Sequence, residues 1–132
     1  MTLRERQDQF IETIGLFDTW SYKFNFLIDD SGLLPEECPE NLNHYRIENC
    51  TSRTCFKASN IDGEIYISGW SNSIIMAGII VTVMKLFDGI PVAELKETEI
   101  DFHIRSGLTY NLTFMRQSAL NEIIDRINRL KY

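Results

Sequence analysis

The sequence has no hydrophobic run long enough to cross a membrane and no internal repeat or low-complexity segment. Its longest apolar stretch, Ile74 to Phe87, is interrupted by Thr82 and Lys85, whereas a membrane-spanning helix needs about 20 apolar residues. We therefore expect no membrane partner. The length fits one globular domain over residues 1–132.

Basic residues are in short supply. The chain has 13 Lys and Arg against 19 Asp and Glu, a net charge of −6 and a pI of about 4.9. This balance argues against nucleic acid or an anionic membrane surface as the main partner. It is compatible with docking onto a basic patch of another protein.

Cysteines are few, and their number, three, is odd. The first six residues carry charges but are not followed by the apolar core of a signal peptide. Free thiols in a reducing cytosol are the simplest interpretation, so we expect a cytoplasmic protein.

Two of the cysteines lie in the stretch 47–56, where reactive side chains are most closely spaced. Cys50 is followed by two small hydroxyl residues and then by Arg53. A thiol attacks as its thiolate, and loop N–H groups or a nearby cation lower its pKa. Cys50 is therefore the candidate nucleophile. The alternative is a turn cysteine without a role.

Hydrophobic periodicity predicts an α+β fold with a small antiparallel sheet packed against several helices. We expect a hairpin over 55–70 that turns at Asp62-Gly63, because Asp-Gly is a strong hairpin signal. We also expect a loop over 33–43, a short strand at 45–47 and an ambiguous segment over 96–112. The predicted helices are a first one from Leu3 to about Gly15, a second one capped by Asp18 or Thr19, a central buried one over 74–87, a short one over 92–95 and a last one over 120–130.

This order of elements, together with several local motifs, resembles the SufE family from about Phe10 to Leu130. The family pattern Gly-Cys-x-Ser-x-Val-Trp corresponds to Asn49-Cys50-Thr51-Ser52-Arg53-Thr54-Cys55. The weaker correspondences are Asp18-Thr19-Trp20, Leu34-Pro35, Asp62-Gly63, Trp70-Ser71-Asn72-Ser73 with Gly78, Asp88-Gly89-Ile90-Pro91 and Leu112-Thr113-Phe114-Met115-Arg116. The resemblance implies a single domain with a SufE/NifU-like fold.

The family resemblance also implies a function. SufE proteins accept sulfur from SufS-type cysteine desulfurases, which are PLP enzymes, during iron–sulfur cluster assembly. Cys50 would take the persulfide sulfur and pass it to an iron–sulfur scaffold protein. The chain would work as a sulfurtransferase-like carrier that activates the desulfurase, as a monomer or homodimer, with no cofactor or metal of its own.

Five further residues are assigned to the predicted site. Arg53 and Arg116 would raise the thiolate character of Cys50. Ser52 would donate to the thiolate or close the turn, and Asn49 replaces the family glycine in a tight turn. Cys55 could resolve a Cys50 persulfide or disulfide, although a strand cysteine is more often a small buried hydrophobe.

The chain departs from the family pattern at Asn49, Cys55, Trp70 and Phe114. These departures leave a second hypothesis, a docking or regulatory relative that binds a desulfurase and transfers nothing. A third is a zinc or iron–sulfur module built from Cys38, His44, Cys50 and Cys55, whose spacing lacks the usual close cysteine pair. His103 has no local partner pattern and is expected at the surface or in the core.

Overall fold

The computed structural model describes residues 1–48 and 52–132, and Asn49, Cys50 and Thr51 lie outside the described residues. Its sheet is the predicted hairpin, in which β1 (Thr54–Ile61) pairs antiparallel with β2 (Glu64–Ser71). Asp62 and Gly63 connect the strands with φ of 54° and 88°. A type I′ turn requires positive φ at both central residues, so the Asp-Gly signal is confirmed.

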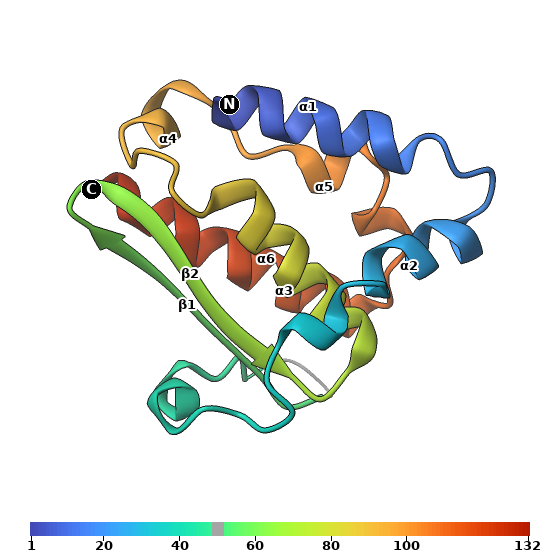
Figure 1. Cartoon of the computed structure of the whole chain (residues 1–132), viewed down its shortest axis with the longest axis horizontal. Helices are drawn as coiled ribbons and strands as arrows, with labels where there is room; N and C mark the ends of the chain where they lie inside the picture. Colours follow the sequence, from blue (N-terminus) through green and yellow to red (C-terminus); the bar gives the residue numbers. More distant parts are fainter. Residues whose placement is uncertain (49–51) are drawn as a thin grey trace.

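Helices pack around this hairpin, and the predicted α+β class is confirmed (Figure 1). The α-helices are α1 (Leu3–Ile14), α2 (Trp20–Ile28), α3 (Ile74–Phe87), α4 (Glu94–Glu97), α5 (Phe102–Arg105) and α6 (Phe114–Asn128). Short 3-10 helices are η1 (Ser31–Leu33), η2 (Glu40–Tyr45), η3 (Thr109–Asn111) and η4 (Arg129–Lys131). A hydroxyl side chain caps each of the four longest helices, at Thr2, Thr19, Ser73 and Thr113.

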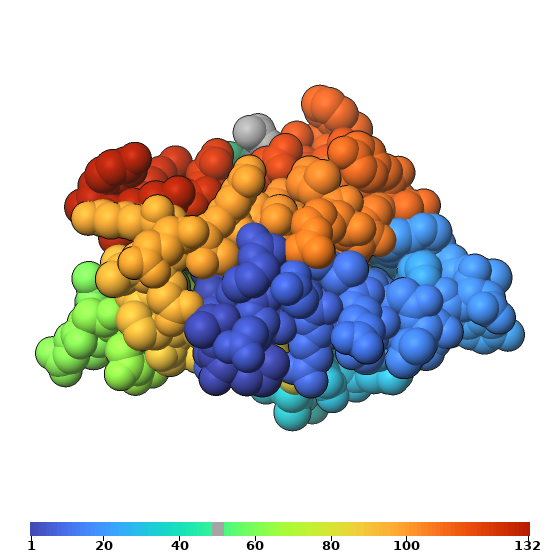
Figure 2. Space-filling view, turned by 90° about the horizontal axis from the view of Figure 1, so that it is seen from above, coloured from blue at the N-terminus to red at the C-terminus, as the bar shows by residue number. Residues whose placement is uncertain are grey.

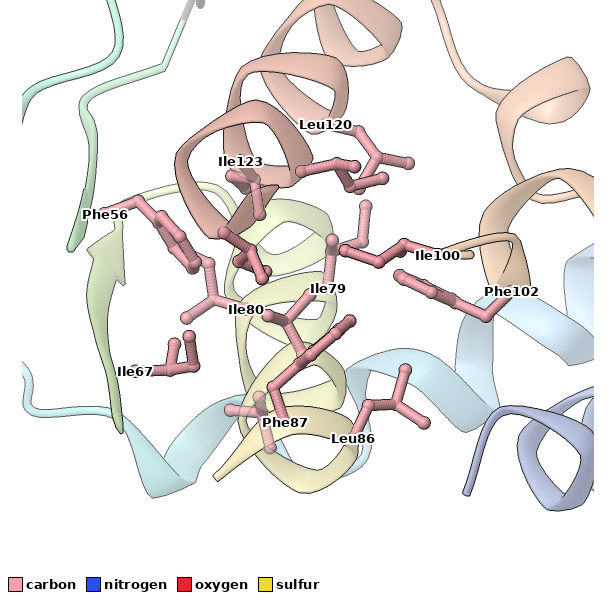
Figure 3. Close-up of a cluster of buried hydrophobic side chains, with 14 of the residues drawn as sticks. Phe56, Ile67, Ile79, Ile80, Leu86, Phe87, Ile100, Phe102, Leu120 and Ile123 are labelled. Atoms are coloured by element: carbon pink, nitrogen blue, oxygen red, sulfur yellow. The ribbon is translucent and has the colours of Figure 1, made fainter. Parts of the chain in front are cut away.

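The main core lies between one face of the hairpin and the helices α3 and α6 (Figure 3). In β2 the residues alternate, so that Ile65 and Ile67 are buried while Glu64, Tyr66 and Ser68 are exposed. Phe56 of β1 points to the same side and is fully buried. The alternation predicted from the sequence therefore selects the face that the helices cover.

The described residues cover the opposite face at one end of the hairpin. Cys55 and Trp70 are a register pair on this face, and both are buried against Leu42 of η2. Cys38 and Tyr45 pack against the same small cluster. Through this second cluster, the segment before residue 48 packs against one end of the hairpin. This end is formed by the start of β1 and the end of β2, and it is far from the turn (Figure 1).

The segment 94–105 lies alongside α1, as the orange and blue surfaces in Figure 2 show. Gln7 is fully buried between them. Its Oε1 accepts from the backbone N–H groups of Asp101 and Phe102 at 2.8 and 3.0 Å, and its Nε2 donates to the Glu99 carbonyl at 3.0 Å. Gln7 thereby holds residues 99–102, and Arg4 adds bonds to Asp101 and to the Glu99 carbonyl, so that α1 fixes the first part of the segment that the sequence left ambiguous.

Four local predictions need correction. The last helix, expected over 120–130, begins six residues earlier, at Phe114, and ends at Asn128. The expected strand at 45–47 is reduced to a single bridge between Arg46 and Cys55. The loop expected over 33–43 contains most of η2, and the short helix begins two residues later than predicted, at Glu94. Among the described residues, no helix is both long and apolar enough to span a membrane.

Candidate functional site

The chain on both sides of residues 49–51 is fastened to the hairpin. Before them, buried Ile47 donates its N–H to the Thr54 carbonyl at 2.8 Å. After them, the Arg53 N–H donates to Asn72 Oδ1, and Arg53 O accepts from the Asn72 N–H, both at 3.1 Å. Cys50, the predicted nucleophile, lies outside the described residues between these anchors. The described structure thus holds both ends of the segment that carries it.

Arg126 of α6 fastens this segment from the other side. Its Nη1 donates to the carbonyls of Tyr45 and Phe56 at 2.7 and 2.6 Å, and its Nη2 donates to the Arg46 carbonyl at 3.0 Å. Glu122, one turn earlier, accepts from Nε at 3.0 Å. The guanidinium binds the carbonyls of residues 45 and 46, so these carbonyls do not extend the pairing with a neighbouring strand beyond a single bridge. This contact accounts for the absence of the predicted strand at 45–47. This role of Arg126 was not predicted, because the only local signal for it in the sequence is the spacing of Glu122 and Arg126 by four residues.

Hydroxyl groups connect Ser52 to Ser73 at the start of α3. Ser52 Oγ lies 3.2 Å from Thr54 Oγ1, which lies 2.8 Å from Ser71 Oγ. Ser71 Oγ also accepts from the Ser73 N–H at 3.1 Å, and Ser73 caps α3. Thr54 and Ser71 are buried, so this hydroxyl chain satisfies groups that water does not reach. Both predicted roles of Ser52, donation to the Cys50 thiolate and closure of the turn, stay predictions.

Arg53 lies over the covered end of the hairpin, close to the cysteine segment. Its Nη2 donates to Asn43 Oδ1 of η2 at 2.8 Å, and its guanidinium lies 5.9 Å from the centre of the Trp70 ring. Both partners are uncharged. Across residues 1–48 and 52–132, no carboxylate pairs with Arg53, so its positive charge is not neutralised by an ion pair there.

Arg116, the second predicted cation, occupies the first turn of α6, whose N-cap Thr113 accepts from its backbone N–H at 3.4 Å. It is half-buried. Its side chain makes no hydrogen bond or ion pair with the part of the chain that the structure describes. The described contacts therefore bring Arg53, but not Arg116, to the anchors of the cysteine segment.

Cys55 lies beside Cys38, with which the sequence grouped it only in the hypothesis of a metal module. The two Sγ atoms are 3.8 Å apart, and the Cys38 thiol donates toward Cys55. Cys55 is 1% exposed, while Cys38 is half-buried. Burial raises the pKa of the Cys55 thiol, and the contact with Cys38 raises it further. The predicted resolving role toward Cys50 stays a prediction.

A metal site finds no support in the described contacts. Within the described ranges, no three His, Cys, Asp or Glu side chains are grouped closely enough to hold an ion. His44 is exposed. His103, which was expected at the surface or in the core, is in the core with 6% exposure.

The comparisons with known proteins agree with this architecture. The family model of the SufE domain, described as an Fe-S metabolism associated domain, matches residues 8–131. The chain belongs to the SufE family. A hypothetical protein from Thermus thermophilus, whose structure was solved in solution, shares the fold with a TM-score of 0.71 at 14% identity, and the match covers 95% of each chain. Membership of this family supports a role in iron–sulfur metabolism.

Two departures from the SufE pattern fall on one cross-strand pair. Cys55, which replaces the pattern's tryptophan, is directly opposite Trp70 in the hairpin register. The indole of Trp70 donates to the Pro35 carbonyl at 2.9 Å and lies under the Arg53 guanidinium. This chain therefore places an indole on β2 at the position that pairs with the site of the family tryptophan on β1.

Proposed function

We propose that this SufE protein is a sulfur carrier. It accepts persulfide sulfur on Cys50 from a SufS-type cysteine desulfurase and passes it to an iron–sulfur scaffold protein. The observation that supports the proposal most is the double anchoring of the segment around Cys50, through Ile47–Thr54 before it and Arg53–Asn72 after it. Such anchors on a rigid hairpin suit a thiol that must react inside another protein, because they fix where the reactive segment begins and ends.

The first step would be a thiol exchange. The Cys50 thiolate attacks the outer sulfur of the persulfide on the desulfurase cysteine; a new S–S bond forms on Cys50, and the old S–S bond breaks. The desulfurase cysteine leaves as a thiolate. PLP remains with the desulfurase, so the carrier needs no cofactor. Release to the scaffold repeats the exchange in the opposite sense, with the Cys50 thiolate as the leaving group.

Arg53 is the described residue best placed to favour the thiolate form. It is three residues after Cys50, its backbone is held by Asn72, and its guanidinium has only uncharged partners among the described residues. A cation without a carboxylate partner retains its full effect on a nearby thiol. Arg116 and Asn49 remain proposed contributors, while Ser52 is proposed to keep the turn closed.

A second candidate is a docking relative that stimulates a desulfurase without carrying sulfur. The change of the cross-strand pair to Cys55 and Trp70 favours it, because this pair lies next to the anchors of the cysteine segment. Both candidates bind the same enzyme, and they differ in whether Cys50 is needed.

Desulfurase turnover with Cys50→Ser separates them. A SufS-type enzyme would be assayed for alanine production from L-cysteine with wild-type carrier, Cys50→Ser or Cys38→Ser, the last being a matched change at a half-buried thiol outside the proposed transfer. A carrier predicts that stimulation is lost with Cys50→Ser and kept with Cys38→Ser. Full stimulation by Cys50→Ser would overturn the carrier and support the docking relative.

A further inference from the structure

The contact between Cys38 and Cys55 is not used in the proposed sulfur transfer, in which Cys50 is the only thiol of this chain that reacts. Its sulfur atoms are 3.8 Å apart, whereas a disulfide bond is about 2 Å long. One sulfur must therefore move by about 2 Å, the scale of a side-chain rotation, for the bond to form. The two residues come from different elements, a strand and an irregular segment, and contact each other through the small cluster with Leu42 and Trp70.

The two thiols differ in accessibility. Cys55 is fixed in β1, paired in register with Trp70 and 1% exposed. Cys38 is half-buried and lies in the irregular segment between η1 and η2, where the backbone makes no ladder hydrogen bonds. The outer thiol can therefore meet a small oxidant, and its segment can adjust while the strand stays in place.

We propose that Cys38 and Cys55 form a disulfide when the protein meets a hydroperoxide. The Cys38 thiolate attacks one oxygen of the hydroperoxide; the O–O bond breaks, the alcohol or water leaves, and Cys38 becomes a sulfenic acid. The Cys55 thiolate then attacks the Cys38 sulfur; the S–O bond breaks and hydroxide leaves, taking up a proton as water. The two thiols lose two electrons in total, and the hydroperoxide gains them.

This bond would have two consequences. It would tie the segment before η2 to β1, next to the Arg46–Cys55 bridge. It would also occupy Cys55, so that Cys55 could not form a disulfide with Cys50, and Cys50 would remain a free thiol. The proposal does not depend on sulfur transfer, and its test needs no desulfurase.

Trypsin makes the test unambiguous because it cuts after Lys and Arg. The three cysteines then fall on three separate peptides, 24–46, 47–53 and 54–57. Reduced wild-type protein would be treated with hydrogen peroxide, blocked with iodoacetamide and measured by mass spectrometry before and after digestion. Cys38→Ser and Cys50→Ser are the matched variants, and thermal unfolding before oxidation confirms that each is folded.

The expected result is a loss of two hydrogens in wild type and in Cys50→Ser, once the carbamidomethyl group on each free thiol is subtracted, with peptides 24–46 and 54–57 joined. Cys38→Ser should not show this loss. The proposal is overturned if peptide 47–53 is in the dominant cross-link. It is also overturned if wild-type Cys38 gains two or three oxygen atoms while Cys55 remains alkylated.

Discussion

Replacing Arg126 with methionine removes the guanidinium but keeps most of the side-chain stem. Three carbonyls, those of Tyr45, Arg46 and Phe56, then lose a charged donor. A hydrogen bond to a charged group contributes about 1.5–3 kcal/mol when buried and less where water can replace it. Arg46 O is at the surface, so we expect a combined loss of about 3 kcal/mol in the free energy of unfolding.

That loss converts into a measurable change in the melting temperature. The entropy of unfolding is about 2.1 cal/mol/K per residue near 60 °C, which for this chain gives a fall of about 11 °C. Differential scanning calorimetry of wild type and Arg126→Met measures it directly. The matched control is Arg129→Met on the following turn, where the side chain is 68% exposed and its ion pair within residues 1–48 and 52–132 is with Glu122 at 3.7 Å.

Exposed ion pairs contribute about 0–1 kcal/mol, so Arg129→Met should lower the melting temperature by no more than about 4 °C. The reasoning about Arg126 fails if its variant melts within about 4 °C of wild type. It fails equally if the two variants melt together, because the contacts with the three carbonyls would then add nothing to an ordinary surface charge.

Two further predictions concern the core. Gly78→Ala would place a Cβ against the Leu27 carbonyl, so it should destabilise the protein by about 2–3 kcal/mol in urea titrations. The control is Gly32→Ala, which has open space around its Cβ and should change the stability little. Burial lowers the pKa of His103, so the unfolded state takes up the proton first and stability should fall as the pH drops below about 6.5. In thermal melts between about pH 7 and pH 5, His103→Gln should reduce this fall in stability, while His44→Gln, at an exposed position, should preserve it. An equal dependence of stability on pH in wild type and both variants would contradict the role given to His103.

Local signals were enough to predict the parts of the fold that depend on neighbouring residues. A type I′ turn requires positive φ at both central residues, and Asp62 and Gly63 tolerate this conformation. Because the connection has two residues, it also sets the hairpin register. The apolar run 74–87 has only one way to satisfy its backbone and bury its side chains, a core helix that begins at the Ser73 cap. The first and second helices followed from the same periodicity, which also indicated the last helix but missed its first two turns, from Phe114 onward.

Long-range contacts decided what the sequence could not show. In the sequence, Arg126 is an ordinary cation near the end of a helix. The carbonyls that it binds are far from it in sequence, and only the fold brings them together. The spacing of Cys38 and Cys55 gives no sign of their contact, which depends on how η2 folds back onto the hairpin. Gln7 likewise fixes the segment near Phe102 through backbone groups that carry no sequence pattern.

The central claim is that Cys50 carries sulfur, and mapped mass spectrometry after incubation with a SufS-type desulfurase and L-cysteine tests it most directly. Non-reducing tryptic digestion isolates Cys50 on peptide 47–53, away from the other two cysteines. The account predicts that this peptide gains mass in steps of one sulfur atom, and that the gain disappears with reductant and is missing in Cys50→Ser. An unchanged peptide 47–53, beside a desulfurase that is shown to turn over, would contradict it.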